Sequence, residues 1–265
     1  MNFSIPFYKF HGTGNDFILI DNRMGRVFNP EQIRLWCNRH LGIGADGFIL
    51  IEDDSAGTDF YMRYFNADGE EASLCGNGSR CAVALAHHLY LIDKDCAFRA
   101  FDGIHQATIL KQSSYSWQVS LQMNEVTVIQ EFDDGYFTDT GSPHFVQFKE
   151  NLDQFDILQE GKLLRHDARF GEGCNINFID YKNDVLYVRT YERGVEDETL
   201  SCGTGVTASA IILINDQNRP DGLYTVPVVT PGGNLTVKFN KKGDSFQNIL
   251  LEGPAVFAFS GGIPA

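Results

Sequence analysis

The sequence predicts an α/β fold of the α+β type with two pseudo-symmetric lobes, each a mostly antiparallel sheet wrapped around a central helix. Two stretches of the form Cys-Gly-x-Gly, at residues 75–78 and 202–205, each precede a run rich in alanine and aliphatic residues. Small residues ahead of an apolar run of helical length are typical of a turn that leads into a buried helix. Short β-rich segments surround both runs, so we expect a sheet around each helix.

An internal repeat predicts the two lobes. Cys202 lies 127 positions after Cys75 (202 − 75), and the same offset relates other residues of the two halves in the same order. These pairs are Thr13 and Thr140, Gly14 and Gly141, Tyr64 and Tyr191, Glu71 and Glu198, Gly76 and Gly203, and Gly78 and Gly205. We therefore expect a first domain, residues 1–124, that carries Cys75. The second, residues 125–265, carries Cys202, and its last strand can cross back to the first lobe.

The first lobe opens with a glycine-containing turn at residues 12–16. Farther on, Asn29 is placed as an N-cap, with Pro30 at the first helical position and Gln32 three residues after the cap, in the manner of a capping box. The predicted elements are strand 17–21, helix 30–39, strands 48–51 and 60–65, central helix 77–91, and strands 107–110 and 117–121.

The second lobe repeats this plan. Asn151 and Gln154 form a second N-cap signal of the same kind. The predicted elements are strand 145–148, helix 152–160, strands 175–179 and 185–191, central helix 204–215, and strands 235–239 and 249–251. In both lobes the cysteine of the turn is expected at the N-terminus of the central helix.

Composition argues against several classes of partner. The 265 residues carry a net charge of −14 and the pI is near 4.8, which argues against nucleic acid and anionic membranes as partners. No apolar run reaches the length of a membrane span, and the first residues lack the regions of an export signal, so we expect a cytoplasmic protein. Six cysteines without C-x-x-C spacing predict free thiols and no structural zinc.

The paired cysteines predict acid–base chemistry. A helix N-terminus favours a thiolate and can hold a carboxylate through its N–H groups. If a twofold axis relates the lobes, Cys75 and Cys202 face each other across a bound carbon. One sulfur, as a thiolate, removes a proton and the other returns a proton to the opposite face, which inverts a stereocentre. Such a pair requires no cofactor, neither pyridoxal phosphate nor a metal ion.

Several motifs closely resemble those of the diaminopimelate epimerase family, in the same order from residue 10 to about residue 260. They are FHGTGNDF at 10–17, FNADG at 65–69, CGNGSRC at 75–81, GSPH at 141–144, YERG at 191–194, CGTG at 202–205 and GPAV at 253–256. The resemblance implies a two-lobed fold with a substrate cleft. It also implies a cofactor-independent epimerase that interconverts LL-2,6-diaminopimelate and meso-diaminopimelate for lysine and peptidoglycan synthesis. The partner is then a small amino-acid substrate. Assembly into a homodimer is also possible.

The resemblance also implies roles for individual residues. It makes Cys75 and Cys202 the catalytic acid and base, and His144 and Glu192 residues that tune the thiols. It implies substrate contacts at Asn15, Asn66, Gly76, Asn77, Asn175, Glu192, Arg193, Gly203 and Thr204. Two positions depart from the commonest form of the family, which often has Gln at Gly47 and Asn at Ser142. Both lie where the distal end of the substrate is expected.

Several of these residues also have structural interpretations, and other functions are possible. Buried cysteines are usually inert, and we interpret Cys37, Cys81, Cys96 and Cys174 in this way. Asn66 and Asn175 alone would be read as turn residues. Three functions are weighed: a diaminopimelate epimerase, a related two-thiol racemase acting on another amino acid such as proline or hydroxyproline, and a cysteine hydrolase or non-catalytic amino-acid binder. A hydrolase gives no reason for a second cysteine at the matching place.

Overall fold

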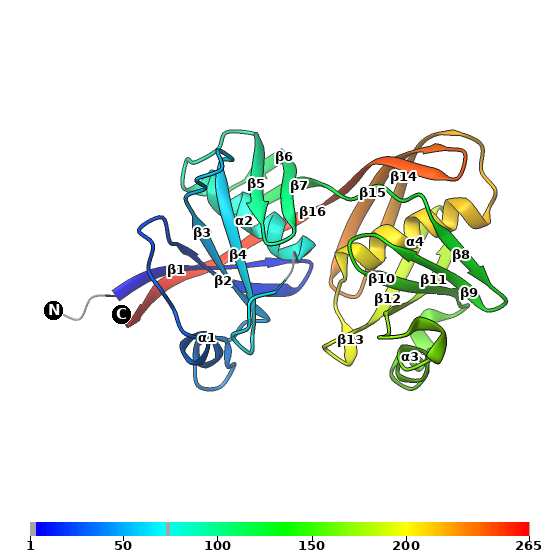
Figure 1. Cartoon of the computed structure of the whole chain (residues 1–265), viewed down its shortest axis with the longest axis horizontal. Coiled ribbons are helices and arrows are strands. Elements are labelled where there is room, and N and C mark those ends of the chain that lie inside the picture. Colours follow the sequence, from blue (N-terminus) through cyan, green and yellow to red (C-terminus); the bar gives the residue numbers. More distant parts are fainter. Residues whose placement is uncertain (1–3, 73–74, 265) are drawn as a thin grey trace. The chain divides into compact units, whose positions relative to one another are not determined.

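The computed structural model describes residues 4–72 and 75–264, so the first three residues, on which the expectation about an export signal partly rests, lie outside it. The chain divides into two compact units, Met1–Leu121 with Gly253–Ala265, and Gln122–Glu252. We call the first unit the N-lobe and the second the C-lobe (Figure 1).

The strands of the N-lobe form a closed ring. They are β1 (Ser4–Gly12), β2 (Asn15–Asp21), β3 (Gly47–Glu52), β4 (Phe60–Asn66), β5 (Asp95–Ala100), β6 (Gly103–Ser113), β7 (Ser116–Gln122) and the later part of β16 (Ser245–Pro264). Neighbours follow chain order from β1 to β7, and β16 then pairs with β7 through residues 253–256 and with β1 through residues 256–264. β2–β3 and β4–β5 are parallel, and the other pairs are antiparallel.

The C-lobe repeats this topology. Its strands are β8 (Ile129–Phe132), β9 (Gly135–Asp139), β10 (Pro143–Phe148), β11 (Asn175–Lys182), β12 (Val185–Glu192), β13 (Asp197–Thr199), β14 (Gly222–Thr230), β15 (Gly233–Lys242) and the first part of β16. β10–β11 and β12–β14 are parallel and the other pairs antiparallel. Met123 N–H donates to the Ile249 carbonyl, and Val126 bridges to Phe246, so the segment before β8 joins β16.

Each sheet encloses one long helix, as the sequence predicts. These helices are α2 (Gly76–His88) in the N-lobe and α4 (Gly203–Asp216) in the C-lobe. In α2 every residue from Gly76 to Ala86 is buried, and in α4 the run from Val206 to Ile214 is buried throughout. A helix that is apolar all round must be covered on every side, which the surrounding strands achieve. The predicted α+β class with two repeated, mostly antiparallel lobes is confirmed.

A shorter helix covers the outside of each sheet. In the N-lobe α1 (Pro30–Cys37) packs Ile33 and Trp36 against Ile18 of β2 and Phe48 of β3. Because β2 and β3 are covered by α1 on one face and α2 on the other, both strands are apolar along most of their length. In the C-lobe α3 (Ile157–Arg165) has the corresponding place in the chain order, between β10 and β11.

The predicted start of the C-lobe helix is wrong. Residues 152–154 form a single 3-10 turn, and Asn151 adopts a left-handed conformation (φ 56°) without a side-chain cap, instead of the extended conformation of an N-cap. α3 begins at Ile157, where Asp156 caps it by accepting from Gln159 N–H. The capping box predicted at Asn29 and Gln32 is confirmed, with both reciprocal hydrogen bonds present.

Two helices are shorter than predicted at their C-termini. α1 ends at Cys37 because Asn38 adopts an extended conformation and its side chain accepts from the N–H groups of His40 and Leu41. α2 ends at His88 instead of residue 91, because Tyr90 takes a left-handed conformation (φ 60°) that stops the helix.

Candidate active site

The two site cysteines have the same local structure. Cys75 is the N-cap of α2, with φ −106° and ψ 117°, and Cys202 is the N-cap of α4, with φ −110° and ψ 112°. In each case the first turn of the central helix, with its outward-directed N–H groups, follows directly. These N–H groups favour a negative charge on the sulfur or on a bound carboxylate. The predicted placement of both cysteines is confirmed.

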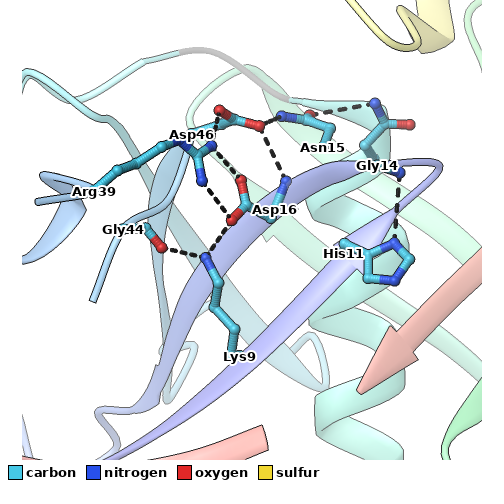
Figure 2. A network of polar contacts seen from close by, with 9 residues as sticks. Lys9, His11, Gly14, Asn15, Asp16, Arg39, Gly44 and Asp46 are labelled. Atoms are coloured by element: carbon cyan, nitrogen blue, oxygen red, sulfur yellow. Dashed lines mark hydrogen bonds and ion pairs between the residues drawn. The ribbon is translucent and has the colours of Figure 1, made fainter. Parts of the chain in front are cut away.

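In the N-lobe Cys75 lies against two asparagine side chains. The Cys75 thiol donates to Asn15 Oδ1 over 3.5 Å, and Asn77 Nδ2 donates to the same oxygen over 3.2 Å. Asn15 Nδ2 in turn donates to Asp46 Oδ2 over 2.8 Å (Figure 2). The structure therefore brings together three of the predicted residues, and it adds Asp46.

A group of charged residues supports Asp46, as Figure 2 shows. Arg39 Nη2 donates to Asp46 Oδ1 over 2.6 Å and to Asp16 Oδ1 over 2.7 Å, and Lys9 donates to Asp16 and to the Gly44 carbonyl. Burial acts to raise the pKa of Asp16, but the hydrogen bonds from Arg39 and Lys9 outweigh it and hold the pKa below its usual range. Asp16 is therefore an anion at neutral pH.

A buried arginine lies at the first turn of α2. Arg80 Nη2 donates to Asn77 Oδ1 over 2.6 Å, and the guanidinium also reaches the carbonyls of Gly76 and Pro254, at 3.4 Å each. Its side chain is fully buried, and burial lowers its pKa. A guanidinium has only donors, so this contact requires that Asn77 turn its oxygen to Arg80 and its nitrogen to Asn15.

In the C-lobe His144 lies next to the hydroxyls around Cys202. Its Nε2 atom is 2.9 Å from Ser142 Oγ and 2.9 Å from Thr204 Oγ1, and Thr204 Oγ1 is 3.5 Å from Cys202 Sγ. Burial lowers the pKa of His144 to about 3, and the charge of Arg193 acts in the same direction. The imidazole is therefore neutral at physiological pH.

The hydrogen bonds of Asn177 determine which nitrogen of His144 carries the proton. Asn177 Nδ2 donates to the Phe145 carbonyl over 3.1 Å, and Asn177 Oδ1 accepts from Thr190. The same Nδ2 is 3.0 Å from His144 Nδ1, which must accept. The Nε2 atom then carries the hydrogen and donates to the two hydroxyls, which leaves the Thr204 hydrogen able to point to Cys202.

Other predicted residues lie around the same hydroxyls. Asn175 Nδ2 donates to Ser142 Oγ over 3.3 Å, and Asn175 Oδ1 accepts from Arg193 N–H over 2.9 Å. Glu192 ends β12 and its Oε2 atom accepts from Thr199 Oγ1 over 2.7 Å. The structure thus joins Asn175 and Arg193 to the network around His144.

The glycine at 205 makes the close approach of Asn177 and His144 to α4 possible. A Cβ atom at Gly205 would lie 2.3 Å from Asn177 Oδ1 and 3.2 Å from His144 Cε1. The first distance is far below contact distance, so any larger residue would displace the side chain that holds His144. The second glycine of the C-lobe turn therefore serves the histidine network as well as the turn.

Gly47 is the position where the family often has Gln, and a neighbouring ring occupies its space. A Cβ atom there would lie 2.6 Å from Tyr64 Cε2. The Tyr64 hydroxyl donates to Asn66 Oδ1 over 2.9 Å, so it fixes the amide of another predicted substrate residue. The Tyr64 ring can therefore occupy this position because residue 47 has no side chain. Ser142, the other departure, is a member of the His144 network.

Sequence reasoning missed Asp46, Arg80 and Asn177. Asn177 carries a signal that could have found it, because it lies two residues after Asn175 in an apolar strand, and alternate residues of a strand share a face. Arg80 lies within the CGNGSRC motif without having been singled out. Asp46 follows the glycine-rich residues 42–44, where the sequence predicts no site residue.

The remaining cysteines are buried thiols, as predicted. Cys37, Cys81, Cys96 and Cys174 are all free and buried. Burial raises the pKa of Cys37, Cys96 and Cys174 to about 12 and that of Cys81 further. Thiols with such pKa values are unreactive at neutral pH.

Among the described residues, 4–72 and 75–264, no group of three or more His, Cys, Asp or Glu side chains has an arrangement that could hold a metal ion. No helix within these residues is both long enough and apolar enough to span a bilayer.

Two repeated lobes, each with a cysteine at the N-cap of its central helix, fit the racemase and epimerase class of isomerases. Comparison with known proteins is more specific. The model of the family described as "Diaminopimelate epimerase" matches residues 7–129 and again residues 136–258, once in each half of the chain. The chain belongs to the diaminopimelate epimerase family.

Curated relatives are similar in sequence to this chain over nearly its full length. A diaminopimelate epimerase of Flavobacterium psychrophilum is 47% identical over 257 residues, which cover 95% of this chain and 97% of the relative. A diaminopimelate epimerase of Chlorobaculum tepidum is 43% identical over 266 residues, with 95% and 98% covered.

Solved structures share the fold at low identity. A PhzF-family phenazine biosynthesis protein of Bacillus anthracis has a TM-score of 0.78 at 14% identity, with 99% of this chain and 100% of that chain covered. A hydroxyproline epimerase of Agrobacterium vitis has a TM-score of 0.72 at 13% identity, with 98% and 92% covered. At such identities the likeness concerns the fold alone.

Proposed function

We propose that this enzyme interconverts LL-2,6-diaminopimelate and meso-diaminopimelate, with Cys75 and Cys202 as the acid and the base. The observation that carries the proposal is the matching N-cap conformation of the two cysteines, in a chain of the diaminopimelate epimerase family. The product would serve lysine and peptidoglycan precursor synthesis in the cytoplasm.

The chemistry requires one sulfur on each face of the substrate α-carbon. A thiolate takes the α-proton, the electron pair stays on the substrate as a carbanion next to the carboxylate, and the opposite thiol gives its proton to the other face. One C–H bond breaks, one forms, and the two sulfurs exchange protonation states. The helix N-termini would stabilise the negative charge that develops on the substrate.

The substrate would be held by polar groups of both turns. Its reacting carboxylate would accept from the backbone N–H groups of residues 76–77 and 203–204. The other proposed contacts are Asn15, Asn66, Asn175, Glu192 and Arg193. The thiols supply both the acid and the base, so the proposal includes no cofactor, and the partner is a small amino acid rather than nucleic acid or membrane.

A chiral assay tests this function. Purified enzyme is incubated with LL-diaminopimelate, and the isomers are followed by chiral chromatography, with L-proline and trans-4-hydroxy-L-proline as parallel substrates. We expect approach to a mixture of LL and meso isomers and no change in the cyclic amino acids. Inversion of either cyclic amino acid, with diaminopimelate left unchanged, would instead support the related two-thiol racemase.

A further inference from the structure

We propose that Asp46 is a positioning residue that holds the amide oxygen of Asn15 toward Cys75, so that in the free enzyme the proton lies on Cys75 and the thiolate is Cys202. The inference rests on the acid–base role proposed for the two cysteines. It concerns a relay of hydrogen bonds in the N-lobe that runs from Arg80 through Asn77 and Asn15 to Asp46.

The direction of every bond in this relay is determined by its two ends. Arg80 can only donate, so Asn77 must present Oδ1 to it, at 2.6 Å, and Nδ2 to Asn15, at 3.2 Å. The Asp46 carboxylate can only accept, so Asn15 must present Nδ2 to it, at 2.8 Å (Figure 2). The oxygen of Asn15 is left facing Cys75 Sγ at 3.5 Å.

An acceptor at the sulfur favours the thiol over the thiolate. The Cys75 S–H can donate to Asn15 Oδ1, whereas a thiolate would face the lone pairs of the same oxygen. The helix N-terminus does not distinguish the two cysteines, because both are N-caps with nearly the same dihedral angles. The side chains around each sulfur must make the difference.

The C-lobe presents the opposite kind of group. Thr204 Oγ1, 3.5 Å from Cys202 Sγ, lies within reach of the His144 Nε2–H donor. With its oxygen accepting from the imidazole, the Thr204 hydroxyl is able to give its own hydrogen to the sulfur. A donor favours the thiolate. The two lobes therefore bias their cysteines in opposite directions, as an acid–base pair requires.

The charged groups around Cys75 come from several elements. Arg80 on α2 favours an anion, Lys9 on β1 and Arg39 after α1 are cations, and Asp16 on β2 is an anion. Asp46 accepts from three donors, Asn15 Nδ2, Asp16 N–H and Arg39 Nη2. An Asn at position 46 has a single oxygen for these three donors, so it holds Asn15 less firmly and leaves Asn77 Nδ2 as the main partner that orients the Asn15 amide.

The test is the rate at which iodoacetamide alkylates each cysteine, read by peptide mass spectrometry without substrate across pH 6 to 10. In Asp46→Asn the Asn15 amide is held mainly by Asn77 Nδ2, so its oxygen keeps a less constant position at the sulfur and accepts less well from the Cys75 S–H. We expect Cys75 to react about threefold to tenfold faster below its pKa, with Cys202 as the unchanged internal reference. Arg39→Gln, at an exposed arginine, leaves the Asp46 carboxylate and its hydrogen bond from Asn15 in place and should change Cys75 reactivity less.

A double variant shows whether Asp46 acts through Asn15. In Asn15→Leu the relay is absent, so adding Asp46→Asn should not alter Cys75 reactivity further. Asp54→Asn, at another carboxylate paired with an arginine in the N-lobe, is the matched control and should behave as wild type. Unchanged Cys75 reactivity in both Asp46→Asn and Arg39→Gln would overturn the proposal, and so would an Asp46→Asn effect that persists without Asn15. Because no substrate is used, these outcomes are independent of the epimerase assay.

Discussion

His144 Nε2 lies 2.9 Å from Thr204 Oγ1, and that hydroxyl is 3.5 Å from the sulfur of Cys202. The neutral imidazole therefore does not contact the sulfur in this network; a hydroxyl stands between them. For the thiol-tuning role proposed for His144, this geometry offers a path to Cys202 that runs through the Thr204 hydroxyl.

Thr204→Val removes this hydroxyl and keeps the shape of the side chain. We expect kcat/KM to fall about tenfold to a hundredfold, the size expected for losing one hydrogen bond to a charged group. The pH at which Cys202 becomes reactive toward iodoacetamide should rise. Thr204→Ser, which retains the hydroxyl, is the control and should stay close to wild type. Equal losses in both variants would contradict a role for the hydroxyl.

His144 should make the fold sensitive to mild acid. Its pKa is lowered to about 3 in the folded protein, against about 6.5 in an unfolded chain. Between these values the unfolded state binds a proton that the folded state does not, so the free energy of unfolding falls as pH drops from 6.5. The slope from this group approaches about 1.4 kcal/mol per pH unit. Urea unfolding between pH 6.5 and 4.5 measures it, and His144→Gln should flatten the curve.

Replacing either site cysteine should abolish epimerisation. We expect Cys75→Ser and Cys202→Ser each to lose at least about a hundredfold in activity, because serine is a far poorer base at neutral pH. Each variant keeps one working thiol, so it should still eliminate a leaving group from one stereoisomer of a β-substituted analogue. Cys96→Ala, at a buried thiol outside the site, is the control. Near-normal epimerase activity in either serine variant would exclude the two-thiol mechanism.

The Gly47 and Tyr64 pair predicts how the distal end of the substrate is held. Tyr64→Phe removes the hydroxyl that fixes Asn66, and we expect KM to rise about threefold to tenfold with little change in kcat. Gly47→Gln collides with the Tyr64 ring and should raise KM more. Steady-state kinetics on diaminopimelate separate the two constants. A fall in kcat alone for Tyr64→Phe would place the hydroxyl at the reacting carbon instead.

The second glycines of the two turns should differ in their tolerance of alanine. At Gly205 a Cβ atom meets Asn177 Oδ1 at 2.3 Å, whereas at Gly78 the nearest atom is the flexible Ile49 Cδ1 at 3.0 Å. We expect Gly205→Ala to lower the free energy of unfolding by about 1–3 kcal/mol and to reduce activity. Gly78→Ala should lower the free energy of unfolding less, as measured by thermal and urea unfolding. The reverse order would contradict the packing described here.

The sequence was informative wherever a local pattern determines the local structure. The 127-residue offset predicted two equivalent helices, and the glycine turns predicted cysteines at their first residues, because small residues ahead of an apolar run have few alternatives. The predicted start of the second-lobe helix, at residue 152 with Asn151 as its N-cap, failed because this local pattern does have an alternative. Asn tolerates a left-handed turn as readily as a cap, and only the packed chain shows that Asp156 caps the helix.

The polar relays could not be predicted, because they join residues far apart in the chain. Asp46 meets Asn15 across 31 positions, and His144 meets Asn177 across 33. The strand pairs β2–β3 and β10–β11 bring these residues together, and both pairs are parallel, with an entire helix between the partners. The local sequence does not determine which residues face each other across such a parallel strand pair. The repeat does not help either, because position 17, the counterpart of His144, is Phe17.

The strand β16 makes one lobe contiguous in the chain and the other discontinuous. Residues 122–252 contain all of the C-lobe, whereas the N-lobe ring is completed only by residues from Gly253 onward. During synthesis on the ribosome β1 and β7 therefore lack their common partner until the last part of the chain emerges. The lobe made first finishes folding last, and the nascent chain must keep two open sheet edges from pairing with other proteins while the C-lobe is being made.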